Sequence, residues 1–428
     1  MLGGGTFVTQ NKTLPGAYIN FISAARASAT LGERGIVAMA LPLTWGVDGA
    51  VFTVTNEDFR KKCLEIFGFE YTSDEAKGLR DLFKNAVTLY CYKMMNGGAK
   101  ASNSIAEAKY KGSTGAKIAT EILVGTASGT YDVNIYFGTS LVYATTVSTI
   151  EELKADENAW VTWKIDTLAE SARESLAGTD LDGTDITVAQ HTEFLTAVEP
   201  YTLNAIACLS SEDAVKELYA QTAKDARDNN GIKYQIVAHN KGADHEGIVN
   251  VKNSLEAVYW TTGAVAGCAV NASNTNKTYD GEFDIPVAYT KADLEEAIKN
   301  GEFVFHRVGD EIRVLEDINS LVTVTTEKGE DFKSNQTIRV IDQIAMDIAS
   351  IFNNKYLGKI PNDRDGRISL WSEIVSHHQQ LQQIRAIEEF DPANVTVEQG
   401  DTKKSVVVSD VVTVVNAMSQ LYMSVIVN

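Results

Sequence analysis

Imidazole and carboxylate side chains, which transition metals favour as ligands, gather most densely in the segment "AHNKGADHEG", which contains His239, Asp244, His245 and Glu246. Their spacing matches neither the helical HExxH pattern nor a zinc-ligand pattern. Loops are commonly rich in the same residue types without binding an ion. The sequence therefore predicts a solvated polar loop here in preference to a metal site.

A second pair of potential ligands is His377 and His378, which are adjacent in the segment "ISLWSEIVSHHQQLQQI". The apolar residues of this segment recur with the period of a helix, and neighbouring residues of a helix point about 100° apart. The two rings should therefore not chelate one ion together. We expect one histidine at the surface and the other packed in the interior.

Two aspartate-rich turns imitate calcium-binding loops without completing them. In "PNDRDGRISLWSE", Asp363 and Asp365 take two EF-hand ligand positions, but Pro361 occupies the first position and the final glutamate is one residue out of place. The segment "TDLDGTDIT" offers Asp180 and Asp182 but lacks the glycine that such a loop needs. Both segments are predicted to be turns.

The motifs that mark common enzymes are also missing. The segment "GSTGAKI" lacks the GxxxxGK[ST] spacing with which backbone amides cradle phosphates. No GxSxG, GxGxxG or Cys/His arrangement occurs. We therefore predict no catalytic residue, no metal ligand and no cofactor. A soluble α/β enzyme whose carboxylates converge only in space remains the alternative.

Composition narrows the possible partners and compartments. The 428 residues carry a formal charge of −19, which disfavours nucleic acid and anionic membranes because both attract basic patches. No apolar run is long enough to span a bilayer, and "MLGGGTFVTQNKTLPG" lacks the basic and apolar regions of a signal peptide. The four scattered cysteines are typical of buried apolar residues in a reducing compartment such as the cytosol.

Hydrophobic patterning predicts an α/β core that is interrupted by a β-rich insertion. Continuous apolar runs such as "IVAMAL" are typical of strands buried on both faces, and they alternate with helical patterns over residues 23–100 and 179–275. Residues 101–178 instead show short alternating runs separated by turn residues, which indicates a small β-rich domain. A further mixed block covers residues 276–417.

Residues 418–428 contain the strand-like run "LYMSVIV". With a period of two, Leu421, Met423, Val425 and Val427 share one face. An exposed strand edge is normally protected by charge, proline or a covering element, and none of these is present here. The run is therefore either buried in its own fold or paired with another chain. Residues 1–22 form a second candidate arm, in which short strand-like pieces follow a triple glycine.

Four stretches, in order along the chain, resemble the sheath proteins of contractile phage tails and R-type bacteriocins, which are related to type VI secretion sheaths. They are "LPGAYINFISAARASATLGERGIVAMALPLTWG", "TDLDGTDITVAQHTEFLTAVEPYTLNAIAC", "IRVLEDINSLVT" and "SVVVSDVVTVVNAMSQLYMSVIVN". Sheaths of phages and defective prophages of Gram-positive bacteria are especially similar. Each stretch is only moderately specific, but the ordered set spans nearly the whole chain.

The resemblance implies a mechanical protein and not an enzyme. Its mixed α/β (α+β) fold would combine an α/β core, an inserted outer domain over residues 101–178, a tube-facing C-terminal domain over 276–417 and extended terminal β arms. The subunit would polymerise as stacked, usually hexameric rings around an inner tail tube, with baseplate and tail terminator proteins as further partners. Contraction would drive the tube through a target cell envelope. Assembly would occur in the bacterial host cytoplasm, as part of a phage tail or bacteriocin particle, without nucleic acid or membrane insertion.

The resemblance also assigns a role to the arms, which in sheaths reach neighbouring subunits and complete a β-sheet there. On this view residues 405–415 are a resident strand, residues 416–420 a lead and residues 421–427 the donated strand. The alternatives are that both termini pair within their own subunit, or that the chain is another structural component such as a tube or adhesin protein. The inter-subunit residues would be Phe7, Val8, Tyr18, Ile19, Phe21, Leu421, Tyr422, Met423, Val425 and Val427.

Overall fold

The structure is a computed structural model that describes residues 31–427 of the chain. The described chain forms two compact units. The first unit holds Glu33–Met346 and the residues from Val414 onward, and the second holds Asp347–Thr413. The predicted N-terminal arm lies outside the described residues, and with it Phe7, Val8, Tyr18, Ile19 and Phe21.

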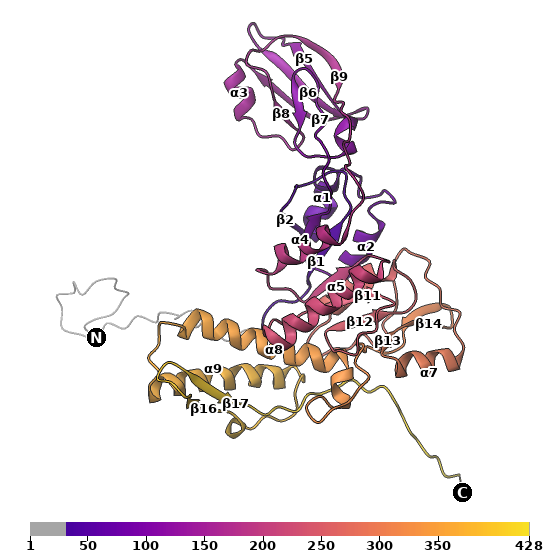
Figure 1. Cartoon of the computed structure of the whole chain (residues 1–428), viewed down its shortest axis with the longest axis vertical. Helices are drawn as coiled ribbons and strands as arrows, with labels where there is room; N and C mark the ends of the chain where they lie inside the picture. The colour runs from indigo at the N-terminus through magenta and orange to yellow at the C-terminus, as the bar shows by residue number, and fades with distance from the viewer. Residues whose placement is uncertain (1–30, 428) are drawn as a thin grey trace, which may run out of the picture. The chain divides into compact units, whose positions relative to one another are not determined.

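The first unit is built on a seven-stranded sheet of order β13-β12-β11-β10-β1-β3-β2 (Figure 1). Neighbouring strands are parallel except for β2, which runs antiparallel to β3 at one edge. This arrangement confirms the predicted α/β core. The strands are β1 (Ile36–Leu41), β2 (Val51–Thr55), β3 (Thr88–Lys93), β10 (Ala205–Cys208), β11 (Gln235–His239), β12 (Ile248–Val251) and β13 (Glu302–Phe303).

Both faces of this sheet are covered, as the continuous apolar runs predict. In β1, Val37 and Met39 belong to a core shared with α1, α2 and α6, whereas Ala38 and Ala40 belong to a second core shared with α4 and α5. Alternate residues of one strand therefore serve opposite layers. The helices are α1 (Asn56–Phe67), α2 (Lys77–Phe83), α4 (Val188–Val198), α5 (Asp213–Lys224) and α6 (Ala257–Gly267).

The segment between the two halves of the core forms the β-rich domain. A four-stranded antiparallel sheet of order β7-β6-β5-β9 packs with a β4-β8 pair and a short helix around one apolar cluster. Its elements are β4 (Ala106–Ala108), β5 (Ile118–Val124), β6 (Tyr131–Phe137), β7 (Ser140–Val147), α3 (Ile150–Ala155), β8 (Val161–Trp163) and β9 (Ser171–Ser175).

The β-rich domain shares part of its interior with the core through Trp45, which follows β1 and is fully buried. The Trp45 ring lies 5.9 Å from the ring of Trp160 and 5.1 Å from that of Tyr110, and its Nε1 donates a hydrogen bond to the carbonyl of Glu65 in α1. Gly68 lies so close that an added Cβ would stand 2.6 Å from Trp45. The junction is therefore a packed interface and not a free linker.

Excision of residues 101–178, with the ends rejoined, should uncover Trp45 and lower the free energy of unfolding by about 1.5–3 kcal/mol, the typical gain from burying a large apolar side chain. Urea denaturation and light scattering would measure stability and association. The same excision combined with Trp45→Gln should reduce association without restoring stability. An excised chain as stable as the full-length protein would show that Trp45 contributes nothing at this junction.

After α6 the described chain continues with helix α7, strand β13, a hairpin and helix α8. Helix α7 (Lys291–Lys299) begins with a capping box between Thr290 and Asp293. Because β13 pairs with β12 in the central sheet, the first unit extends well beyond the predicted boundary at residue 276. The remaining elements of this stretch are β14 (Phe305–Val308), β15 (Glu311–Val314) and α8 (Asn335–Ile351), whose last turn belongs to the second unit.

The second unit contains α9 (Arg364–Gln383) and the antiparallel hairpin β16 (Thr396–Gln399) and β17 (Val406–Ser409). The indole Nε1 of Trp371 in α9 donates to the carbonyl of Val395, which fixes the start of the hairpin to the helix. No described helix is long and apolar enough to cross a membrane.

Candidate functional site

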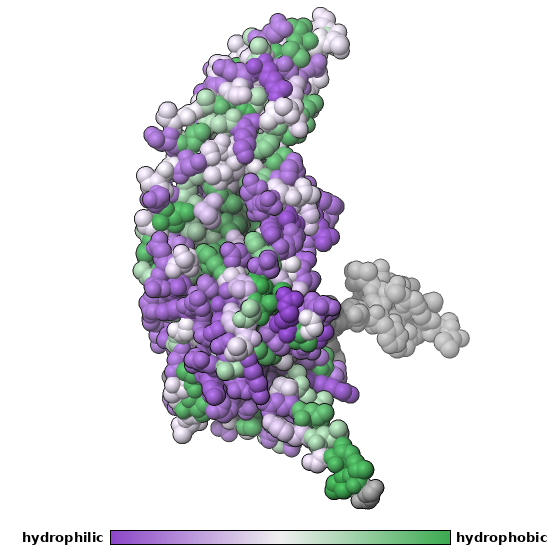
Figure 2. Space-filling view, turned by 90° about the vertical axis from the view of Figure 1, so that its right-hand side faces the viewer, coloured by the Kyte–Doolittle hydropathy of each residue, from purple (hydrophilic) through white to green (hydrophobic). Residues whose placement is uncertain are grey.

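The C-terminal segment exposes large apolar side chains to an unusual degree. Residues 418–427 form an extended trace that pairs with no described strand of the chain (Figure 1). Figure 2 shows their surface as an apolar tip. The exposed fractions are 84% for Leu421, 88% for Tyr422, 76% for Met423, 71% for Val425 and 89% for Val427.

The apolar character of this segment is not confined to the predicted face. Tyr422 and Ile426, which alternate with Met423 and Val425, are as exposed as their neighbours. Strands that are apolar on both faces are normally buried on both faces. A partner of this segment must therefore supply cover on two sides as well as main-chain hydrogen bonds.

The first unit holds the base of this segment through a set of side chains at the start of α8, which we call the arm clasp (Ser334, Gln336, Thr337, Asn416 and Ala417). Gln336 Nε2 donates to the carbonyl of Val415 at 3.0 Å, and Gln336 Oε1 accepts the amide of Ala417 at 2.9 Å. Asn416 accepts from Ser334 Oγ and donates to Thr337 Oγ1, both at 3.0 Å. The chain is therefore fixed as far as Ala417.

The hairpin β16–β17 is a candidate acceptor for such a strand. A two-stranded hairpin is marginal by itself, and these two strands pair only with one another among the described residues. Val407, Val408 and Val411 are exposed on or just after β17. The predicted resident strand over residues 405–415 is shorter in the structure, because the ladder ends at Ser409.

A buried charge network replaces the predicted solvated loop at "AHNKGADHEG". His245 and Glu246 are almost fully buried, which contradicts the prediction for these two residues, whereas Asp244 is exposed as predicted. Their charged partners are Arg227 and Asp228, from the π-helical turn Asp225–Asn229 that extends α5, and Lys328, from the loop before α8. Arg227 of this turn donates to both carboxylate oxygens of Asp342 at 2.8 and 2.7 Å. Arg227 therefore connects this loop to α8, since it faces Glu246 as well as Asp342.

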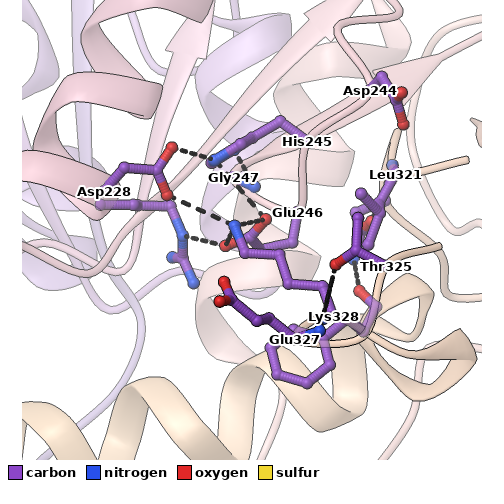
Figure 3. Close-up of polar contacts among 12 residues, drawn as sticks. Asp228, Asp244, His245, Glu246, Gly247, Leu321, Thr325, Glu327 and Lys328 are labelled. Atoms are coloured by element: carbon purple, nitrogen blue, oxygen red, sulfur yellow. Dashed lines mark hydrogen bonds and ion pairs between the residues drawn. The ribbon is translucent and has the colours of Figure 1, made fainter. Parts of the chain in front are cut away.

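Asp228, His245 and Glu246 present ligand atoms within 4.8 Å of one another, a spacing that could hold a metal ion. The Lys328 ammonium already lies among them, however, at 2.9 and 3.0 Å from the two Glu246 oxygens and 3.4 Å from Asp228 (Figure 3). His245 Nε2 pairs with Asp228 at 3.1 Å. The residues therefore satisfy one another, and the positive charge comes from the protein.

The electrostatics of this network follow from burial and from its partners. Burial lowers the pKa of His245 below 6.5, although Glu246 and Asp228 oppose the effect. Burial alone would raise the pKa of Glu246, but the Lys328 hydrogen bond and the His245 charge outweigh it, so this pKa falls below 4.5. The network therefore favours the charged carboxylate of Glu246 and the neutral imidazole of His245.

The network should weaken in acid. As the pH falls, His245 in the unfolded chain takes up a proton near pH 6.5, whereas His245 in the folded chain does so only at lower pH. The stabilisation from the neutral, buried His245 is therefore complete above pH 6.5. It is lost as the pH falls through and below 6.5. The loss amounts to at most about 1.4 kcal/mol per pH unit. A second decline follows below 4.5 as Glu246 is protonated. Urea midpoints between these values should vary less with pH in His245→Gln than in the parent, and equal slopes would contradict this.

The other residues that the sequence suggested for metal binding have structural roles. Asp363 caps α9 and accepts the amide of Gly366 at 2.8 Å, and Asp182 accepts the amide of Ser113 at 2.6 Å. His377 and His378 are both fully buried and their Nδ1 atoms lie 3.1 Å apart. The prediction of one surface histidine is therefore wrong, because the side-chain torsions bring the two rings together despite their divergent Cα–Cβ directions.

Sequence patterns did not reveal the residues that complete these sites. Arg227 and Asp342 are separated by 115 residues, and Lys328 lies 82 residues from Glu246. Each alone resembles a surface charge on a helix or loop. One signal was present, since "HEG" follows a buried strand and precedes another one closely, which leaves little chain to reach solvent.

Three family models match the chain in succession. They are the phage tail sheath protein beta-sandwich domain over residues 96–183, the phage tail sheath protein central domain over 184–320 and the phage tail sheath C-terminal domain over 327–428. Together they cover most of the chain, and their order agrees with that of the β-rich domain, the later part of the core and the C-terminal segment.

Individual proteins agree with the family models. The phage-like element PBSX protein XkdK of Bacillus subtilis is 31% identical over 474 residues that cover 100% of both chains. A sheath tail protein from Desulfitobacterium hafniense is 34% identical, with a TM-score of 0.75 over 90% of this chain and 93% of that one. The contracted helical sheath of the anti-feeding prophage shares the fold, with a TM-score of 0.57 at 11% identity over 97% of this chain and 99% of that one. The chain belongs to the phage tail sheath family.

Proposed function

We propose that this contractile tail sheath subunit polymerises by donating residues 421–427 to the β16–β17 hairpin of another copy. The observation that carries the proposal is the exposure of Leu421, Met423, Val425 and Val427 in a segment that its own chain leaves unpaired. A strand added to an open sheet edge gains main-chain hydrogen bonds, and alternate side chains fix its register. The hairpin offers such edges and exposed valines beside them.

The arm clasp sets how far the donated strand can reach. The clasp fixes Ala417, so the free lead consists of Met418, Ser419 and Gln420, and not of the whole predicted lead over 416–420. Three extended residues span at most about 10 Å. A short lead keeps a neighbouring copy close while still allowing it to turn.

The N-terminal residues Phe7, Val8, Tyr18, Ile19 and Phe21 are proposed as a second connecting arm, by analogy with sheaths. Rings of subunits, hexameric in the usual case, would stack around an inner tail tube that residues 276–417 face. The β-rich domain would lie on the outer surface. Baseplate and tail terminator proteins would bound the polymer, which would assemble in the bacterial host cytoplasm and become part of a phage tail or bacteriocin particle. Contraction would drive the tube through a target envelope.

Sedimentation and negative-stain microscopy of the expressed chain would test this function. A sheath subunit should form rods or tubes, whereas an α/β enzyme should form small discrete oligomers. Within residues 31–427, carboxylates and histidines converge beside Arg227 and Lys328 and around the paired imidazoles of His377 and His378. No observation therefore favours the enzyme over the sheath subunit. Small oligomers at every protein concentration would overturn the proposal.

A further inference from the structure

A linear chain of four polar side chains is buried in the second unit. His377 Nε2 lies 2.9 Å from Asp347 Oδ2, the two histidine Nδ1 atoms lie 3.1 Å apart, and His378 Nε2 lies 2.6 Å from Asp410 Oδ2. Both rings are fully buried, and the side chains of Asp347 and Asp410 are 9% and 23% exposed. All three contacts are within hydrogen-bond distance.

These three hydrogen bonds require three protons. The carboxylates can only accept, so each Nε2 atom must carry a hydrogen. A neutral imidazole has a single N–H, and both rings have then used it. Two nitrogen lone pairs would face one another across the 3.1 Å between His377 and His378. A third proton, placed on either Nδ1, converts this repulsion into an N–H···N hydrogen bond and makes that ring doubly protonated.

The chain of contacts joins three elements that are distant in sequence. Asp347 belongs to α8, His377 and His378 to α9, and Asp410 follows directly after β17. The amide of Gly32 donates to Asp347 Oδ1, and the ring of Phe390 packs edge-on against His378. One helical turn before His377, α9 also carries Glu373, which pairs with Lys355 at 2.8 Å.

We propose that Asp347, His377, His378 and Asp410 form a proton-dependent clamp in which one captured proton ties the segment after β17 to α9. It holds in place the strand that, on the proposed function, receives the arm of another copy. Its state is set by the pH of the surroundings.

The clamp has a definite pH signature. Well above about pH 6.5 the two imidazoles carry two N–H protons in the unfolded chain and three in the folded clamp. Folding therefore takes up one proton, and the folding equilibrium constant falls about tenfold for each unit by which the pH rises. Well below that pH the unfolded rings carry four protons and the dependence reverses. The contribution of the clamp is therefore largest near about pH 6.5 and declines on both sides.

Solid-state 15N NMR of the full chain, labelled at its six histidines, would count these protons whether or not the chain polymerises. At about pH 8 we expect one ring, and only one, with both nitrogens protonated, since free histidine is neutral there. The signal should disappear in His378→Gln and persist in the control His306→Gln. Six singly protonated rings in the parent would overturn the clamp, and so would a signal that changes on addition of EDTA, which would place a metal between the nitrogens.

Urea unfolding gives a second, independent readout. The ratio of the folding equilibrium constants of the parent and His378→Gln should fall about tenfold per unit between roughly pH 7 and pH 9. A constant ratio would contradict the proposal. If His378→Gln does not fold, the NMR measurement on the parent decides. Neither readout depends on rods, so failure of the clamp and failure of the proposed function are distinguishable.

Discussion

Removal of Met418–Asn428 should abolish polymerisation and leave the subunit folded. Each donated strand would contribute several main-chain hydrogen bonds, each worth a net ~0.5–1.5 kcal/mol, together with its apolar faces. The truncation would remove these contacts at every interface between subunits of the polymer. The described part of the segment is exposed in its own chain, so its removal takes little from the monomer. Electron microscopy would show whether rods form, and the melting temperature would show whether the fold survives.

Two point variants distinguish strand pairing in a fixed register from non-specific hydrophobic association of the C-terminal segment. Val425→Asp places a charge on the face shared with Leu421 and Met423, and should prevent rods nearly as well as the deletion. Ser424→Asp, on the opposite face, should be milder. That face also carries Tyr422 and Ile426, so some weakening is expected there as well. Rods from the truncated chain, or failure of that chain to fold, would assign the strand to its own subunit.

Replacement of Asp342 by alanine should destabilise the subunit by about 3–5 kcal/mol, because it leaves the Arg227 guanidinium charged and buried without its bidentate partner. The side chains of the pair are 2% and 8% exposed, so water cannot take over this role. Denaturant unfolding at neutral pH would measure the change. As a matched control, Glu57→Ala breaks the exposed Lys61–Glu57 pair and should leave stability close to that of the parent.

The double replacement Arg227→Met with Asp342→Leu gives the complementary result. Removing both charges avoids an unpaired buried ion, so the double variant should be more stable than Asp342→Ala and close to the parent. Arg227 Nε has no hydrogen-bond partner and lies 3.7 Å from Glu246 Oε1, and Glu246 keeps its ion pair with Lys328 in the double variant. A double variant as unstable as the single one would show that packing, and not the unpaired charge, is the cause.

Local patterns predicted the fold well and the buried polar sites poorly, for a physical reason. The run Ile36–Leu41 predicts a strand buried on both faces, because both of its alternating faces are apolar. The start of α7 is likewise encoded locally, by the capping box of Thr290 and Asp293. Such signals lie within a few residues of one another. The hydrophobic pattern likewise changes to short alternating runs over residues 101–178, which form most of the β-rich domain.

The burial of His245 and Glu246 depends instead on groups that arrive from elsewhere. A charged loop is solvated unless opposite charges reach it, and here they come from Lys328 and from a π-helical turn that rotates Arg227 and Asp228 toward it. No single-sequence pattern encodes that meeting. The pair His377 and His378 shows the same limit, since helix geometry gives the direction of each Cα–Cβ bond but not the torsions beyond it.

The arm clasp also has a mechanical consequence. The chain passes from β17, in the second unit, to Val414 and Ala417, which belong to the first unit and are held by Gln336. If a neighbouring copy binds residues 421–427 as proposed, tension on them would therefore enter the subunit at the start of α8, in the unit that contains the core sheet. The hairpin proposed to bind the arm of another copy would then carry none of the tension on its own arm. A row of subunits could therefore transmit force without breaking the hairpin contacts one after another.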